Sequence, residues 1–370
     1  MKGFLRYTVF LVGTVTILLG LLEIGVLTAR NTSQCLQATR GQREGAPLHA
    51  ARAVALESLK STLGRVFQRS ALFRYEPYEL WTSVKRDEPK LQTDGAGLRR
   101  TPYDRPVADD AASVLVLGGS TLFGHRVSDG ETIPAYMQKM LGPAYRVLNM
   151  GELGFSSAQE LNRMLRFITT IGAPDIVVFY GGFNDTYAGV YSPGIPRHHQ
   201  HAEEFQDGLF EGNILLAPLK KTQIWFLSRW LQRGTRTWNE EAAKRIREHA
   251  PRVVDSWLDH MRVAHAVSGE YGFRTFGFWQ PVIFAGGKEL TGTEQTILKH
   301  EPEALRQAVK AVYDLAAERI EKSGIPNLFD LTDTFRDEKD TIYLDFCHIT
   351  PKGNRTVAER IVEVLTSSEP

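Results

Sequence analysis

The chain has 370 residues, of which 42% are hydrophobic and 24% charged, so its composition is that of a folded protein and excludes bulk disorder. A formal net charge of +1 argues against a general electrostatic affinity for nucleic acid. With only two cysteines, the chain has neither a disulfide-rich scaffold nor a zinc site built from cysteines.

An apolar N-terminal segment predicts a membrane anchor. Lys2 and Arg6 precede an apolar run that reaches Leu27 with one charged interruption at Glu23. Because a bilayer core of about 30 Å takes about 20 residues in a helix, this segment is long enough to span it. A cleaved signal would have a shorter apolar core and a site of small residues. We therefore expect residues 1–30 to be a retained single-pass transmembrane helix, with its N-terminus in the cytoplasm and the rest of the chain exported.

Residues 31–110 are expected to form a juxtamembrane linker and an N-terminal extension. The stretch 31–47 is polar and has few large apolar residues, which is typical of a linker. Apolar residues within 54–67 follow helical spacing and predict an amphipathic helix. The stretch 75–105 is rich in proline, tyrosine and glycine, so we expect short strands and turns that pack against the main domain.

From Ser113 onward, short apolar runs alternate with amphipathic segments, as in an α/β fold with helices on both faces of a parallel sheet. The run Asp175–Tyr180 is apolar after its first residue, which is typical of a strand buried on both faces. We therefore expect one domain over residues 111–370, with an insertion at about 191–250 where the alternation breaks. The expected strands are Ser113–Leu117, Tyr145–Met150, Asp175–Tyr180, Arg274–Trp279 and Asn327–Leu331, and the expected helices are Thr132–Leu141, Ala158–Ile171, Glu303–Lys322 and Gly353–Leu365.

A serine directly follows the first expected strand. In LVLGGSTLFG, Leu115–Gly124, the apolar run ends at two glycines and Ser120 precedes a helix-like segment. The glycine spacing matches a phosphate-binding loop, but His125 and Arg126 stand where such a loop has its lysine and hydroxyl residue. Because open α/β sheets bind ligands at the carboxyl ends of their strands, Ser120 is a candidate nucleophile that needs a base to take its proton.

Asp345 and His348, near the C-terminus, are the candidate acid and base. Their spacing lets the carboxylate reach the imidazole, fix its tautomer and stabilise its charged form. Oxyanion donors are expected after the second and third strands, because glycine lets a backbone N–H approach a ligand and asparagine supplies an amide donor. The polar and glycine residues there are Asn149, Gly151 and Gly154 after the second strand, and Gly181, Gly182, Asn184 and Asp185 after the third.

Together these motifs resemble the SGNH, or GDSL-like, hydrolase superfamily. Gly119-Ser120-Thr121 resembles its first block, Asn149 to Gly154 the second, Gly182-Phe183-Asn184-Asp185 the third, and Asp345-x-x-His348 the fifth. Gly119 departs from the aspartate of the name-giving motif. The resemblance implies a three-layer α/β/α sandwich around a parallel, flavodoxin-like five-stranded sheet, with no cofactor. It also implies a triad of Ser120, His348 and Asp345, and an oxyanion hole formed by Ser120, Gly154 and Asn184.

We expect an exported, membrane-anchored serine esterase, periplasmic or extracellular. The resemblance implies that its substrates are O-acyl esters, O-acetyl foremost, of cell-surface carbohydrate or lipid. An O-acyltransferase on the same scaffold and a non-catalytic polysaccharide-assembly protein are the alternatives.

Gln280, after the fourth strand, is a candidate for either a substrate contact or a turn. Cys347 is either a thiol nucleophile or a packed thiol. No metal is expected, because no carboxylate or cysteine has ligand spacing to His198, His199 and His201.

Overall fold

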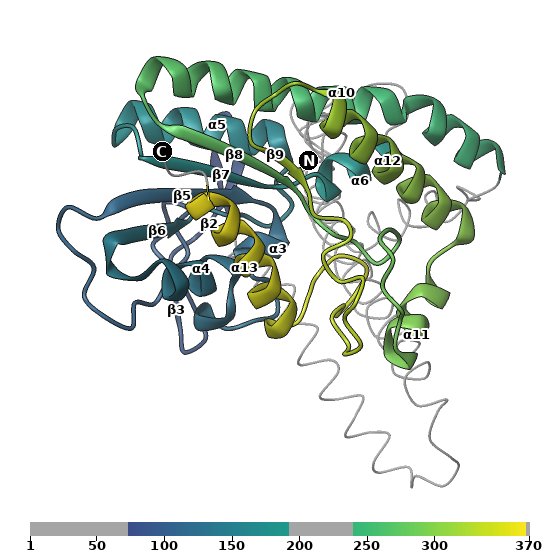
Figure 1. The fold of residues 1–370 in the computed structure, drawn as a ribbon, viewed down its shortest axis with the longest axis horizontal. Helices are drawn as coiled ribbons and strands as arrows, with labels where there is room; N and C mark the ends of the chain where they lie inside the picture. The colour runs from purple at the N-terminus through teal and green to yellow at the C-terminus, as the bar shows by residue number, and fades with distance from the viewer. Residues whose placement is uncertain (1–72, 192–239, 368–370) are drawn as a thin grey trace, which may run out of the picture. The chain divides into compact units, whose positions relative to one another are not determined.

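The centre of the fold is a parallel sheet of five strands (Figure 1). The strands are β5 (Ala112–Gly118), β6 (Tyr145–Asn149), β7 (Ile176–Gly181), β8 (Arg274–Trp279) and β9 (Leu328–Asp330). Their order in the sheet is β6-β5-β7-β8-β9, which confirms the expected flavodoxin-like arrangement. The computed structural model describes residues 73–191 and 240–367, and each strand lies within one residue of its expected ends.

Helices cover both faces of the sheet and make the three-layer α/β/α sandwich (Figure 1). They are α3 (Ser120–Phe123), α4 (Ile133–Leu141), α5 (Ser157–Thr170), α6 (Phe183–Tyr191), α10 (Glu240–Tyr271), α11 (Gly292–His300), α12 (Glu303–Lys322) and α13 (Pro351–Ser367). Successive residues of a strand point to opposite faces. Leu115 and Leu117 therefore share one core with α5, α10 and α12, while Val114 and Val116 share another with α4 and α13. Both faces of β5 are fully covered, as its apolar run predicts.

The segment before the sheet forms two short antiparallel hairpins. They pair β1 (Phe73–Glu76) with β2 (Leu80–Ser83), and β3 (Arg86–Glu88) with β4 (Leu91–Thr93). The expectation of short strands that pack on the main domain is confirmed. Arg99, which follows them, is fully buried, pairs with Asp129 at 2.8 Å and donates to the Phe123 carbonyl oxygen at 2.7 Å. Residues 73–110 of the expected N-terminal extension therefore belong to the same compact unit as the sheet.

The long helix α10 was not expected from the sequence. It has 32 residues and begins at Glu240, inside the range 191–250 assigned to an insertion. It also continues through Pro251 and buries Val254, Trp257 and Met261 in the core. The helix α10 therefore overlaps the C-terminal part of the insertion expected at about 191–250, and residues 192–239 of that range lie outside the described residues.

Several expectations fall on residues outside the described ranges. These are the transmembrane helix at 1–30, the linker, the amphipathic helix at 54–67 and most of the insertion. Within residues 73–191 and 240–367, no helix combines the length and the apolar character that crossing a bilayer requires.

Candidate active site

Ser120 is the first residue of α3 and lies directly beyond the end of β5 at Gly118. A Cβ atom at Gly118 would lie 2.4 Å from the Tyr180 carbonyl oxygen, and one at Gly119 would lie 2.3 Å from Nδ2 of Asn184. Both distances are too short for a carbon atom, so a side chain at either position would force a neighbouring group to move. The glycine pair thus lets the chain before Ser120 pass close to the third strand and to Asn184.

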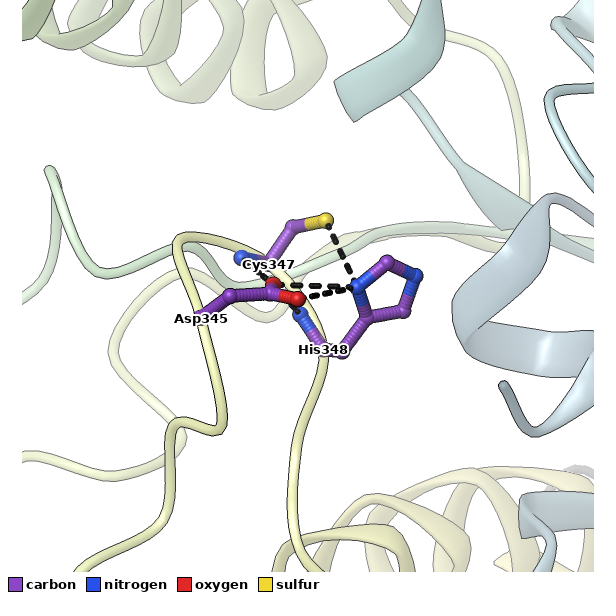
Figure 2. Close-up of side chains that lie close together, drawn as sticks. All are labelled: Asp345, Cys347 and His348. Carbon is purple, nitrogen blue, oxygen red and sulfur yellow. Dashed lines mark hydrogen bonds and ion pairs between the residues drawn. The ribbon is translucent and has the colours of Figure 1, made fainter. Parts of the chain in front are cut away.

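Ser120, His348 and Asp345 form a continuous hydrogen-bonded row. His348 Nε2 lies 2.8 Å from Ser120 Oγ, although the two residues are 228 positions apart. On the other side of the ring, His348 Nδ1 lies 2.8 Å from Oδ2 and 2.9 Å from Oδ1 of Asp345 (Figure 2). Because an ionised carboxylate only accepts hydrogen bonds, Nδ1 carries the ring proton and Nε2 is left to accept from the serine hydroxyl.

The Asp345 carboxylate stays ionised in this setting. Burial would raise its pKa, but hydrogen bonds from the His348 ring and from the backbone N–H groups of His348 and Cys347 outweigh burial and lower the pKa to about 2. The negative charge is thus available to stabilise the imidazolium that forms when His348 takes a proton.

Three potential oxyanion donors come from Ser120 itself and from the residues that follow the neighbouring strands β6 and β7. Asn184 lies at the start of α6, and its Nδ2 donates to the Phe155 carbonyl oxygen at 2.6 Å, which leaves its second amide hydrogen for a ligand. The N–H groups of Ser120 and Gly154 donate to no oxygen in the part of the chain that the structure describes. Gly154 has a φ of +79°, a left-handed conformation that favours glycine. These donors have the character that an oxyanion hole requires.

The N-terminal extension holds the loop that carries Gly154, and no motif in the sequence signals this. The fully buried Glu152 accepts hydrogen bonds from the Ser83 N–H and the Ser83 hydroxyl, both at 2.7 Å. Trp81 Nε1 donates to the Leu153 carbonyl oxygen at 2.9 Å. Since both contacts come from β2, this hairpin fixes the residues immediately before Gly154.

Gln280 and Asn149 have structural partners. Only 2% of Gln280 is exposed, and its Nε2 donates to Thr121 Oγ1 at 3.4 Å. Gln280 is thus buried against Thr121, the residue after Ser120, which favours a packing role over a substrate contact. Asn149 is also buried, and its Oδ1 accepts from the Gly151 N–H at 3.1 Å, as in a turn.

His125 lies beside the row and was not singled out as a site residue. Its ring centroid is 4.9 Å from that of His348, with the two rings tilted by 56°. Burial, followed by the nearby charges of His348 and Arg126, lowers the pKa of His125 and so favours its neutral form. A neutral ring lets His125 face the imidazolium of His348 without repelling it.

Asp345, Cys347 and His348 are the metal-capable cluster in the part of the chain that the structure describes, with ligand atoms within 4.8 Å of one another (Figure 2). A thiol binds a metal as its thiolate. Burial raises the pKa of Cys347 well above its ordinary value, so the thiol keeps its proton. The carboxylate and Nδ1 already satisfy each other. The donor set thus fits a hydrogen-bonded acid–imidazole pair better than a metal site.

Replacing Cys347 with alanine is expected to leave kcat for ester hydrolysis within about threefold of the wild-type value. Its Sγ lies 3.7 Å from Nδ1 of His348, the nitrogen opposite the one that faces Ser120, and only 3% of the residue is exposed. Steady-state kinetics of Cys347→Ala with p-nitrophenyl acetate test this. A loss as large as that in Ser120→Ala would make the thiol the nucleophile instead.

No family model and no curated protein matches this chain. Among solved structures it is similar to a lipolytic protein of the G-D-S-L family from Veillonella parvula, with 12% identity and a TM-score of 0.39 over 69% of this chain and 99% of that one. It is also similar to a carbohydrate acetylesterase family member from Sinorhizobium meliloti, with 15% identity and a TM-score of 0.36 over 69% and 98% of the two chains. A catalytic mutant of an acetylxylan esterase from Geobacillus stearothermophilus shares 14% identity, with a TM-score of 0.37 over 69% and 94%.

Proposed function

We propose that this protein is a serine esterase of the SGNH type. The observation that carries the proposal is the unbroken row from Ser120 Oγ through the imidazole of His348 to the carboxylate of Asp345. A serine hydroxyl is a weak nucleophile until a base takes its proton, and this row supplies both the base and the acid that orients it. The oxyanion donors around Ser120 supply the remaining requirement of acyl transfer.

The mechanism follows from the atoms of the row. As Ser120 Oγ attacks the ester carbonyl carbon, its proton passes to His348 Nε2 and the carbonyl oxygen becomes an oxyanion. The N–H groups of Ser120 and Gly154 and the Asn184 amide donate to that oxyanion. When the intermediate collapses, His348 returns the proton to the departing alcohol and an acyl-enzyme forms. Water, activated by the same imidazole, then releases the acid and restores Ser120.

We further propose that the substrates are O-acyl esters, O-acetyl foremost, of cell-surface carbohydrate or lipid, and that the domain acts outside the cytoplasm. The support for export is the cationic start and the long apolar run of residues 1–30. The support for an ester substrate is the donor set, which matches the tetrahedral intermediate of an acyl group.

Covalent labelling with a fluorophosphonate tests the nucleophile. We expect the probe to modify the wild-type protein at Ser120, because the row activates that hydroxyl, and to leave Ser120→Ala unmodified. Peptide mass spectrometry locates the adduct. The internal control is the peptide with Ser157, a second serine whose hydroxyl oxygen lies 2.7 Å from Nδ1 of a histidine, His260. Labelling that survives Ser120→Ala would sink the proposal, as would an ester-hydrolysing preparation that takes no label.

A further inference from the structure

A second row of serine, aspartate and histidine lies behind the oxyanion residues. The Ser157 hydroxyl lies 2.5 Å from Oδ1 of Asp185 and 2.7 Å from Nδ1 of His260. The Ser157 N–H also donates to both carboxylate oxygens of Asp185 at 3.2 Å. The three residues come from α5, α6 and α10, so the row joins three helices on one face of the sheet.

The order of groups in this row gives it a different chemistry from the first one. In the first row the imidazole stands between the serine and the carboxylate, whereas here the serine stands in the middle. Asp185 only accepts, so the Ser157 hydroxyl proton points to the carboxylate and the hydroxyl oxygen accepts from Nδ1–H of His260. No base is left to activate Ser157, and the row is a structural bridge.

Two of the three residues of the bridge are close in sequence to the groups that hold the oxyanion donor Asn184. Asp185 directly follows Asn184, and Ser157 comes two residues after Phe155, whose carbonyl oxygen holds the Asn184 amide at 2.6 Å. The hydrogen bond between Ser157 and Asp185 and the hydrogen bond from the Asn184 amide to Phe155 therefore both connect the start of α5 with the start of α6. Any shift of α5 against α6 would move the Asn184 amide relative to Ser120.

The bridge depends on its donors because it lies among acidic groups. Burial raises the pKa of Asp185 above its ordinary value, and the hydrogen bonds of Ser157 and the charge of His260 counter only part of that rise. The neighbouring Glu160 is fully buried, its pKa is raised well above the ordinary value by burial and then by Asp185, and its two oxygens have no hydrogen-bond partner among the described residues. Among Ser157, Glu160 and His260, only His260 brings a positive charge, and its N–H donates to the Ser157 hydroxyl that in turn donates to Asp185. Both effects favour the ionised form of the Asp185 carboxylate.

We propose that His260 is a positioning residue that acts through Ser157 and Asp185 to hold the oxyanion donor Asn184 in place. The inference rests on the proposed esterase function. It assigns a role to α10, which packs against both α5 and α6.

The test compares two replacements of His260. His260→Leu removes the donor, whereas His260→Asn places an amide N–H near the position of Nδ1. We expect kcat with p-nitrophenyl acetate to fall about tenfold in His260→Leu with KM unchanged, a fraction of the loss that follows removal of a whole oxyanion donor. Phenylboronic acid, whose tetrahedral adduct mimics the intermediate, should bind more weakly by a similar factor. His260→Asn should recover most of both losses.

Asp259→Asn is the matched control, because Asp259 precedes His260 on α10, is 66% exposed and pairs with Arg262 at the surface. If His260→Leu does not fold, Ser157→Ala removes the bridge at its centre and should show the same fall in kcat and in boronic acid affinity. The inference is wrong if these variants keep wild-type kcat and boronic acid affinity. It is also wrong if His260→Asn restores the midpoint of thermal unfolding but restores neither kcat nor the affinity for phenylboronic acid. A wild-type protein without Ser120-dependent turnover would overturn the proposed function itself, which separates the two failures.

Discussion

Replacing Asp345 with asparagine is expected to lower kcat for ester hydrolysis about 10,000-fold while the fold is retained. In the wild-type row the carboxylate accepts from Nδ1 of His348 at 2.8 Å, so Nε2 can accept the proton of Ser120. An amide can donate to Nδ1 instead, which moves the ring proton to Nε2 and leaves Ser120 without a base. The amide also lacks the charge that stabilises the imidazolium.

Asp345 also contributes to stability, and the assay has to allow for this. The native state lowers its pKa from 3.8 to about 2. The carboxylate therefore stabilises the fold fully above the unfolded pKa of 3.8, and this contribution is lost as the pH falls through about 2. At pH 7 the variant is thus expected to unfold at a somewhat lower temperature. Activities should be compared well below both unfolding midpoints.

Steady-state kinetics with p-nitrophenyl acetate, together with thermal unfolding, measure the effect. Asp340→Asn is a matched control, since Asp340 precedes Asp345 in the same loop, is 71% exposed and pairs with Lys352 at the surface. That variant should keep the wild-type kcat. An Asp345→Asn protein that retains more than about a tenth of the wild-type kcat would show that His348 needs no carboxylate partner.

The convergence of the site residues could be predicted because it follows from sheet geometry. Ser120, Gly154 and Asn184 each follow a parallel strand, and parallel strands end at one shared edge. The apolar runs predict the strands, and parallel strands predict a shared edge. Residues that follow different strands therefore meet at this edge although they are far apart in the sequence. His348 does not follow a strand but lies in the loop before α13. Its spacing from Asp345 is the sequence feature that indicates this part of the site.

The remaining features depend on contacts that leave no local pattern. Nothing near Ser83 or Glu152 indicates that a hairpin buries a carboxylate beside Gly154, because the contact joins segments 69 residues apart. Proline removes a backbone hydrogen bond from a helix interior and so predicts a helix end, yet α10 continues through Pro251. Burial of residues such as Trp257 on the following turns stabilises the helix more than the proline disfavours it. Tertiary packing outweighs local propensity at both places.

Gly119→Ala is expected to lower kcat about 100-fold, close to the effect of removing one oxyanion donor. The backbone at Gly119 has a φ of −82°, which alanine adopts without strain. The added methyl group would lie 2.3 Å from Nδ2 of Asn184 and 3.2 Å from the Phe155 carbonyl oxygen, so the amide has to move.

A double-mutant cycle distinguishes displacement of Asn184 from general damage to the site. Asn184→Ala alone should lower kcat by about as much as Gly119→Ala, and the double variant should lose little more than either one, because the methyl group then has no amide to displace. Gly130→Ala is the matched control, because its Cβ would meet no atom within 4 Å and its φ is not left-handed. Additive losses in the double variant would mean that Gly119 and Asn184 act independently. In that case the glycine before Ser120 would matter for the path of the chain into α3, and Asn184 would be held by Phe155 alone.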